Sequence, residues 1–177
     1  MITPAWCRLM AAYSAEMNRR VFRAASRLSD AERRRDRGAF FGSIHATLNH
    51  ILWGDRVWMH RLAEGWERPR GGIPASTTLH DTFDDLRAAR EEADRRIEHW
   101  AAGLTEAWLA EDLVWFSGAT QRAWRRPKWI LVTHLFTHGT HHRGQVHAML
   151  TAAGVTPEDT DLPFILDLEA LGLMQGR

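Results

Sequence analysis

Five of the ten histidines of this chain lie between residues 134 and 147, and three of them, His134, His138 and His142, follow one another at intervals of four. Histidines four residues apart project from successive turns of one helix face, so two rings can reach one metal ion. On a wheel of ~100° per residue, one sector holds most of these rings together with apolar residues that we expect to face inward. That sector contains His134, His138, His141, His142, Gln145, Ile130, Leu131, Leu135, Ala148 and Met149.

A single histidine on an apolar helix face is usually a core residue whose ring is satisfied by a hydrogen bond. Four on one face are harder to explain in this way, because each buried ring needs a partner of its own. Neutral imidazole is the commonest metal ligand, and a helical bundle can supply a third ligand from a facing helix. The pattern therefore favours a metal site. Imidazole ligands suit zinc, nickel, copper and iron alike.

The third ligand is expected from the predicted helix that contains His45, His50 and His60. His50 lies at the edge of its apolar stripe, and Gly54, one turn later, leaves space beside it. The wheel separates His50 from His45 only marginally, so periodicity leaves both open.

Other residues near these motifs have testable roles. Gln145 is placed to orient a bound water or substrate, and Asp55 to accept an imidazole N–H or to pair with an arginine. Arg143 points off the histidine sector, so we expect it in a surface salt bridge. Gly144 costs about 1 kcal/mol relative to alanine within a helix, which predicts a close approach of neighbouring atoms there. Cys7 is the only cysteine, so a disulfide and a cysteine-based zinc site are excluded.

Four long helices should position these side chains, over about residues 4–28, 43–64, 79–102 and 127–153. Thr3 and Pro4 form a helix start, Thr78 is the expected cap of the third helix, and Pro127 opens the fourth. Shorter features are a helical turn after Ser29, a loop over residues 65–78, a hairpin within residues 112–126 and one short helix in the tail. The prediction is an all-α four-helix bundle with a small β-hairpin before the last long helix.

Length and composition narrow the class of protein. A chain of 177 residues is expected to form one domain, residues 1–177. Acidic and basic residues number 22 and 23, and this near balance argues against a nucleic-acid binder despite the basic runs at residues 33–35 and 124–129. Neither a secretory signal nor a membrane-spanning stretch is visible, so we expect a cytoplasmic protein without membrane contact.

Three motifs resemble those of one family. The segment HLFTHGTHHRGQ (residues 134–145) is similar to the signature helix of the DinB/YfiT-like family of metal-dependent enzymes. LNHILWGDR (residues 48–56) resembles the second-helix motif of that family, and DLPF (residues 161–164) a recurrent tail. The resemblance implies a four-helix bundle and a divalent metal, most often nickel or zinc, with iron or manganese as further choices. It also implies a homodimer.

Carried over by motif, the resemblance implies that His50, His138 and His142 are the ligands, and that His134 and His141 line the same pocket. Three histidines without an obvious fourth ligand leave coordination positions open, as catalytic rather than structural sites do. Catalytic residues are not assigned, although Gln145 joins the two pocket histidines as a candidate.

The family includes thiol S-transferases that use bacillithiol or glutathione-like cofactors, and a mycothiol-dependent isomerase. The resemblance therefore implies a thiol S-transferase or related group-transfer enzyme acting on a small molecule, with a thiol cosubstrate. The alternatives are a metal-dependent hydrolase and a non-enzymatic, stress-related metal-binding protein.

Overall fold

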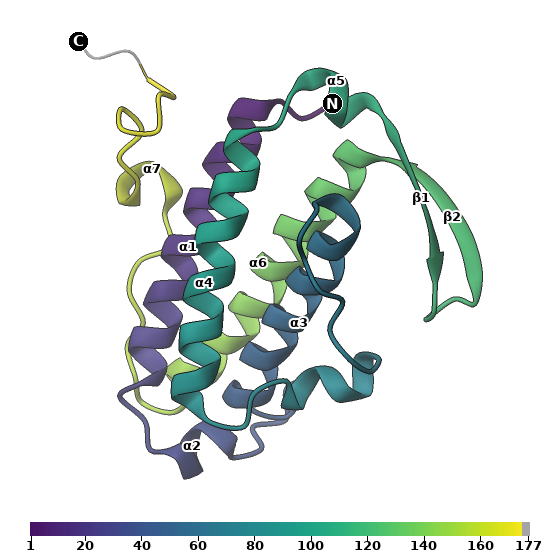
Figure 1. Ribbon diagram of the computed structural model, residues 1–177. Coiled ribbons are helices and arrows are strands. Elements are labelled where there is room, and N and C mark those ends of the chain that lie inside the picture. The colour runs from purple at the N-terminus through teal and green to yellow at the C-terminus, as the bar shows by residue number, and fades with distance from the viewer. Residues whose placement is uncertain (175–177) are drawn as a thin grey trace.

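The computed structural model describes residues 1–174, and four long helices dominate it. α1 packs against α4 and α6, and α3 packs against the same two helices, so the four close into a ring (Figure 1). This arrangement confirms the predicted four-helix bundle. The long helices are α1 (Pro4–Ala25), α3 (Ile44–Leu62), α4 (Phe83–Ala102) and α6 (Lys128–Ala152).

Side-chain caps set the starts of three long helices. Thr3 accepts a hydrogen bond from the Trp6 amide, as predicted, and Ser43 caps α3 in the same way. The predicted cap of the third helix was wrong, because Thr82 rather than Thr78 accepts from the amide of Asp85. The hydroxyl of Thr82 also donates to the Asp85 carboxylate at 2.7 Å, so the two residues hold the first turn reciprocally.

The connections contain shorter helices. Ser29 caps a short helix, as predicted, whereas the segment expected to be a plain loop ends in a 3₁₀ helix. A further short helix after Thr105 was not predicted. These elements are α2 (Asp30–Arg34), the 3₁₀ helix η1 (Ile73–Thr78), α5 (Glu106–Ala110) and α7 (Leu162–Ile165).

The predicted hairpin is present between α5 and α6. Strands β1 (Asp112–Ser117) and β2 (Arg122–Pro127) pair antiparallel, with Trp115 directly opposite Trp124. The hairpin projects beside the bundle as a separate arm (Figure 1). It leads directly into α6, which carries most of the histidines.

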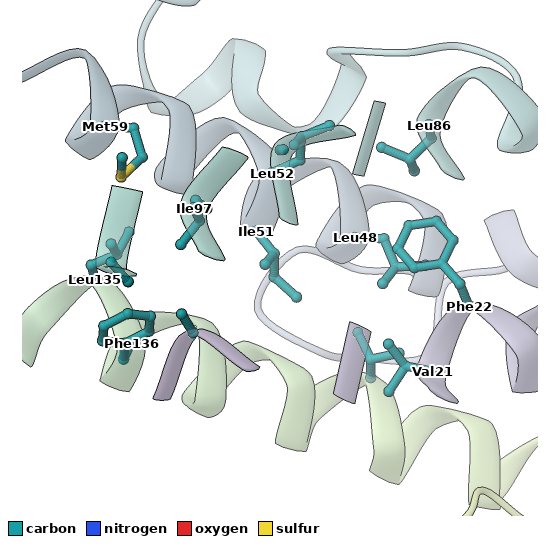
Figure 2. Close-up of a cluster of buried hydrophobic side chains, with 14 of the residues drawn as sticks. Val21, Phe22, Leu48, Ile51, Leu52, Met59, Leu86, Ile97, Leu135 and Phe136 are labelled. Atoms are coloured by element: carbon teal, nitrogen blue, oxygen red, sulfur yellow. The ribbon is translucent and has the colours of Figure 1, made fainter. Parts of the chain in front are cut away.

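The core fills the space between the four long helices. Figure 2 shows side chains from all four meeting there, and Phe22 stacks on Phe83 with ring centroids 5.4 Å apart. Cys7 is fully buried as a small apolar group. Within residues 1–174, no helix is long and apolar enough to cross a membrane. The side chains labelled in Figure 2 are Val21, Phe22, Leu48, Ile51, Leu52, Met59, Leu86, Ile97, Leu135 and Phe136.

Candidate metal centre

Three histidines from two neighbouring helices meet beside the core. His50 comes from α3, and His138 and His142 come from α6. One ring nitrogen of each lies within 4.8 Å of the others, and the Nε2 atoms of His50 and His138 are 3.2 Å apart. Two imidazole nitrogens at tetrahedral positions about 2.0–2.1 Å from one ion are separated by about 3.3 Å. The spacing therefore fits a single small divalent ion.

Hydrogen bonds fix which nitrogen of His50 is available. The single hydroxyl proton of Ser76 is donated to the carbonyl oxygen of Ile73 at 2.6 Å, so Ser76 Oγ accepts from His50 Nδ1 at 2.8 Å. The proton of His50 is thereby held on Nδ1, and its Nε2 lone pair faces the other two histidines.

His142 is oriented in the same way by its own helix. Its Nδ1–H donates to the amide oxygen of Gln145 at 2.8 Å, which leaves Nε2 of His142 without a proton. The amide oxygen of Gln145 therefore orients a ring of the cluster. That Gln145 also orients a bound water or substrate stays a prediction. Two of the three rings are thus in the tautomer that a metal requires.

His138 lies between the other two rings and packs against the backbone of α3. A Cβ atom at Gly54 would lie 2.7 Å from Cε1 of His138, so only glycine leaves room for this ring. Nδ1 of His138 is buried and has no hydrogen-bond partner within the described chain. Its position is therefore set by packing rather than by a hydrogen bond.

Burial keeps the three rings neutral. It lowers the pKa of His50 to about 4 and that of His138 to about 3, and mutual repulsion among the rings adds to both shifts. Burial also lowers the pKa of His142. Neutral imidazoles with converging lone pairs are the donor set that zinc, nickel and iron accept, so the residues fit a bound metal ion.

Comparison with known proteins shows the family of this chain. Residues 1–175 match the DinB family, which is nearly the whole chain. The chain belongs to the DinB family. Comparison with curated proteins and with solved structures finds no significant match. The family assignment therefore rests on the family match alone.

In this DinB-family protein, the structure decides between the two histidines of α3 that the wheel left open. His50 joins His138 and His142, whereas His45 is buried elsewhere and its Nε2 lies 3.1 Å from the carbonyl oxygen of His80. His60 is exposed and bonds through Nδ1 to the carbonyl oxygen of Trp66.

The two predicted pocket histidines lie on the solvent side of the cluster. His134 contacts His138 with ring centroids 5.5 Å apart, and His141 contacts His142 at 4.8 Å. Both are exposed, so the prediction that four histidines share the inward face was wrong. Because α6 packs against both α3 and α1, its buried sector centres ~120° away from His134 on a 100°-per-residue wheel.

The expected surface role of Arg143 was wrong for the same reason. Arg143 is 6% exposed, and its guanidinium donates to Thr140 Oγ1 at 3.0 Å and to Ser14 Oγ at 3.3 Å. The expected close approach at Gly144 was also wrong, since a Cβ there meets nothing within 4 Å. The close approach is at Gly139, where a Cβ would lie 3.0 Å from Nη1 of Arg143.

Aromatic side chains shield the cluster. Phe41 stacks on His50 with ring centroids 3.9 Å apart and lies 5.4 Å from His142, and the Trp53 ring lies 6.0 Å from that of His50. Phe41 and Ser76 were not predicted as part of the site, and both lie in segments that connect the long helices. Neither residue belongs to a periodic pattern, so no sequence signal linked it to the histidines.

Proposed function

We propose that this DinB-family protein is a metal-dependent enzyme that transfers the sulfur of a small thiol to an electrophilic substrate. The observation that carries the proposal is the convergence of three neutral imidazole nitrogens from His50, His138 and His142. These residues would hold a divalent ion, nickel or zinc in our proposal, which would act as a Lewis acid and lower the pKa of a bound thiol or water.

The makeup of the cluster supports an open site. Among residues 1–174 the group holds three histidines and no fourth cysteine, histidine or carboxylate. Three protein ligands leave room for small molecules, as in catalytic zinc sites. The histidine rings themselves are held by Ser76 and Gln145, while Phe41 covers one face of His50 and excludes water from it.

The transferred sulfur has to come from a cosubstrate. Cys7 is fully buried in the core, and burial raises the pKa of its thiol to about 11, so it is not a nucleophile. In the proposed reaction a carbon–sulfur bond forms as the bond between carbon and its leaving group breaks, and the leaving group departs with the bonding pair. His134, whose ring lies 5.5 Å from that of His138 and whose pKa is lowered by the partial burial of its ring, would accept the thiol proton.

The metal half of the proposal is tested by metal analysis of protein purified without a histidine tag. We expect about one divalent ion per chain, as in other three-histidine sites. His138→Ala should lose the ion and keep its helical circular dichroism, whereas His147→Ala, on the same helix but outside the cluster, should keep it. A wild-type chain that takes up no nickel or zinc would contradict the proposal.

The reaction half is tested with the metal-loaded protein. A panel of thiols offered to an electrophile is compared with ester and amide substrates, and turnover is measured for each. Turnover that requires both thiol and metal supports sulfur transfer. Metal-dependent hydrolysis without thiol would instead identify a hydrolase, and metal binding without any turnover would identify a binding protein.

A further inference from the structure

A face of the hairpin carries two arginines stacked on tryptophan. Directly opposed residues of an antiparallel pair lie on one face, so Trp115 and Trp124 are neighbours. Arg122 and Arg126, two residues on either side of Trp124, share that face. Their guanidinium carbons lie 3.6 and 4.6 Å from the centre of the Trp124 ring. The positive charges are thus held over an aromatic ring.

The same face meets α3. Trp115 packs edge-to-face on Trp58, with ring centroids 5.7 Å apart. The guanidinium carbon of Arg61 lies 4.7 Å from the centre of the Trp58 ring and 6.0 Å from that of Trp115. Together these side chains form an arginine–tryptophan cluster, which consists of Arg61, Arg122, Arg126, Trp58, Trp115 and Trp124.

None of the three arginines forms an ion pair with a carboxylate within residues 1–174. Neighbouring basic residues outside the cluster differ in this respect. Arg125, on the opposite face of β2, bonds to Asp112 at 2.8 Å, and Lys128 bonds to Glu111 at 2.6 Å. The cluster therefore keeps a positive charge that its surroundings do not neutralise.

The adjoining helices add no negative charge to this surface. α6 contains no acidic residue, and the only one in α3, Asp55, is buried and paired with Arg90. A ligand on this surface meets three guanidinium groups and aromatic rings. Arginine is weakly hydrated and presents a planar fork that matches a carboxylate, so this combination favours an organic anion.

A chain of ring contacts joins the arginine–tryptophan cluster to the metal centre. The Trp58 ring lies 5.0 Å from His134, whose ring lies 5.5 Å from His138. Trp58 is eight residues beyond His50 on α3, which corresponds to about 12 Å along the helix axis. A ligand with one end at the histidines would therefore reach Trp58, the edge of the arginine–tryptophan cluster, with a group about 12 Å away.

We propose that the arginine–tryptophan cluster binds the carboxylate end of a peptide-like thiol whose sulfur lies at the metal centre. Three residues of extended peptide span about 10–11 Å, close to the rise of about 12 Å from His50 to Trp58 along α3. This inference rests on the proposed function, because it names the class of thiol that the same site would use. The near-neutral charge of the chain favours a small anion over a nucleic acid.

The test uses S-methylglutathione, which keeps both carboxylates of a tripeptide thiol but has no free thiol, so that binding does not require the metal. Its affinity is measured by calorimetry for wild type, Arg61→Met and Arg126→Met. Methionine preserves much of the apolar bulk over the tryptophan rings. We expect each variant to bind about 10- to 100-fold more weakly, the effect of losing a charge-assisted hydrogen bond. Arg125→Met, on the opposite face of the hairpin, should bind like wild type.

Two further results would overturn the proposal. One is equal affinity of wild type for S-methylglutathione and for its dimethyl ester, which lacks both negative charges. The other is a single-stranded oligonucleotide that competes for the cluster and loses affinity in the same arginine variants, which would identify a nucleic-acid surface. Arginine-dependent binding that persists in His138→Ala would support this inference even if the metal-dependent reaction failed.

Discussion

Two polar clusters lie on different faces of α3, and they use their polar atoms in opposite ways. In the arginine–carboxylate cluster, Arg90 is 1% exposed and bonds to Asp55 at 2.6 Å and to Asp94 at 2.8 Å. Asn18 adds a hydrogen bond to Asp94 at 2.8 Å. In the histidine cluster, by contrast, the rings are neutral, and Nε2 of His50 and of His142 carries no proton.

The difference separates a structural role from a functional one. Charges that are buried together with their counter-charges are paired within the fold, so they do not need a charged ligand. Neutral rings whose outer nitrogens are tied to Ser76 and Gln145 present their inner lone pairs to a ligand. Polar residues in a bundle interior are thus best distinguished by whether their charges or lone pairs already have a counterpart within the chain.

The largest expected effect comes from breaking the arginine–carboxylate cluster. Arg90→Met leaves the carboxylates of Asp55 and Asp94 buried without their counter-charge, and should lower the free energy of unfolding by about 3–5 kcal/mol. Arg95→Met, on the exposed side of α4, removes only a surface pair with Glu92 and should cost less than about 1 kcal/mol. Urea unfolding measures both. A small effect of Arg90→Met would show that the buried arginine–carboxylate cluster does not stabilise the fold.

Removing the groups that hold the histidine rings should instead affect metal binding. Ser76→Ala and Gln145→Leu free the rings of His50 and His142 and should each weaken metal affinity by about 10- to 100-fold with little loss of stability. The affinity is measured by competition with a chelator. Thr77→Ala, in the same 3₁₀ helix, should leave affinity unchanged, and an equal loss there would show that the segment acts only through its fold.

A methyl group at Gly54 should displace His138. Because the new Cβ would lie 2.7 Å from the ring, we expect Gly54→Ala to weaken metal affinity by about tenfold, within the about 1–3 kcal/mol range of overpacked sites. The matched substitution Gly144→Ala enters open space on α6 and should stabilise the fold by up to about 1 kcal/mol. If both variants bind metal like wild type, packing does not position His138.

The smallest effect is the pH dependence of the metal-free protein. The folded-state pKa values of His50 and His138, about 4 and 3, lie below the value near 6.5 of an unfolded chain. Their contribution to stability is therefore complete above pH 6.5 and is lost as the pH falls, because the unfolded chain takes up protons first. Between pH 7 and 6 we expect a loss of about 1 kcal/mol in total, after allowing for solvent screening. His138→Ala should make the free energy of unfolding depend less steeply on pH. An unchanged dependence would show that His138 does not contribute to it.

Much of the fold was predictable because its signals are local. The start of α1 at Thr3 and Pro4, the cap at Ser43, the hairpin and the long last helix follow from caps, turns and periodicity over a few residues. The same wheel placed the centre of the buried face of α6 on the wrong side. The wheel left Arg143 outside the core, because a helical wheel contains no information about the number of helices that α6 packs against.

The sequence by itself determined the bundle and the four-residue spacing that brings His138 and His142 to one side of α6, because helix geometry is set by neighbouring residues. Only the tertiary structure decided that His50 rather than His45 meets them, and that Ser76 and Gln145 hold two of the rings. It also placed Trp58 of α3 against the hairpin. These contacts join residues from separate elements, so they depend on how side chains pack between helices, which no periodic pattern specifies.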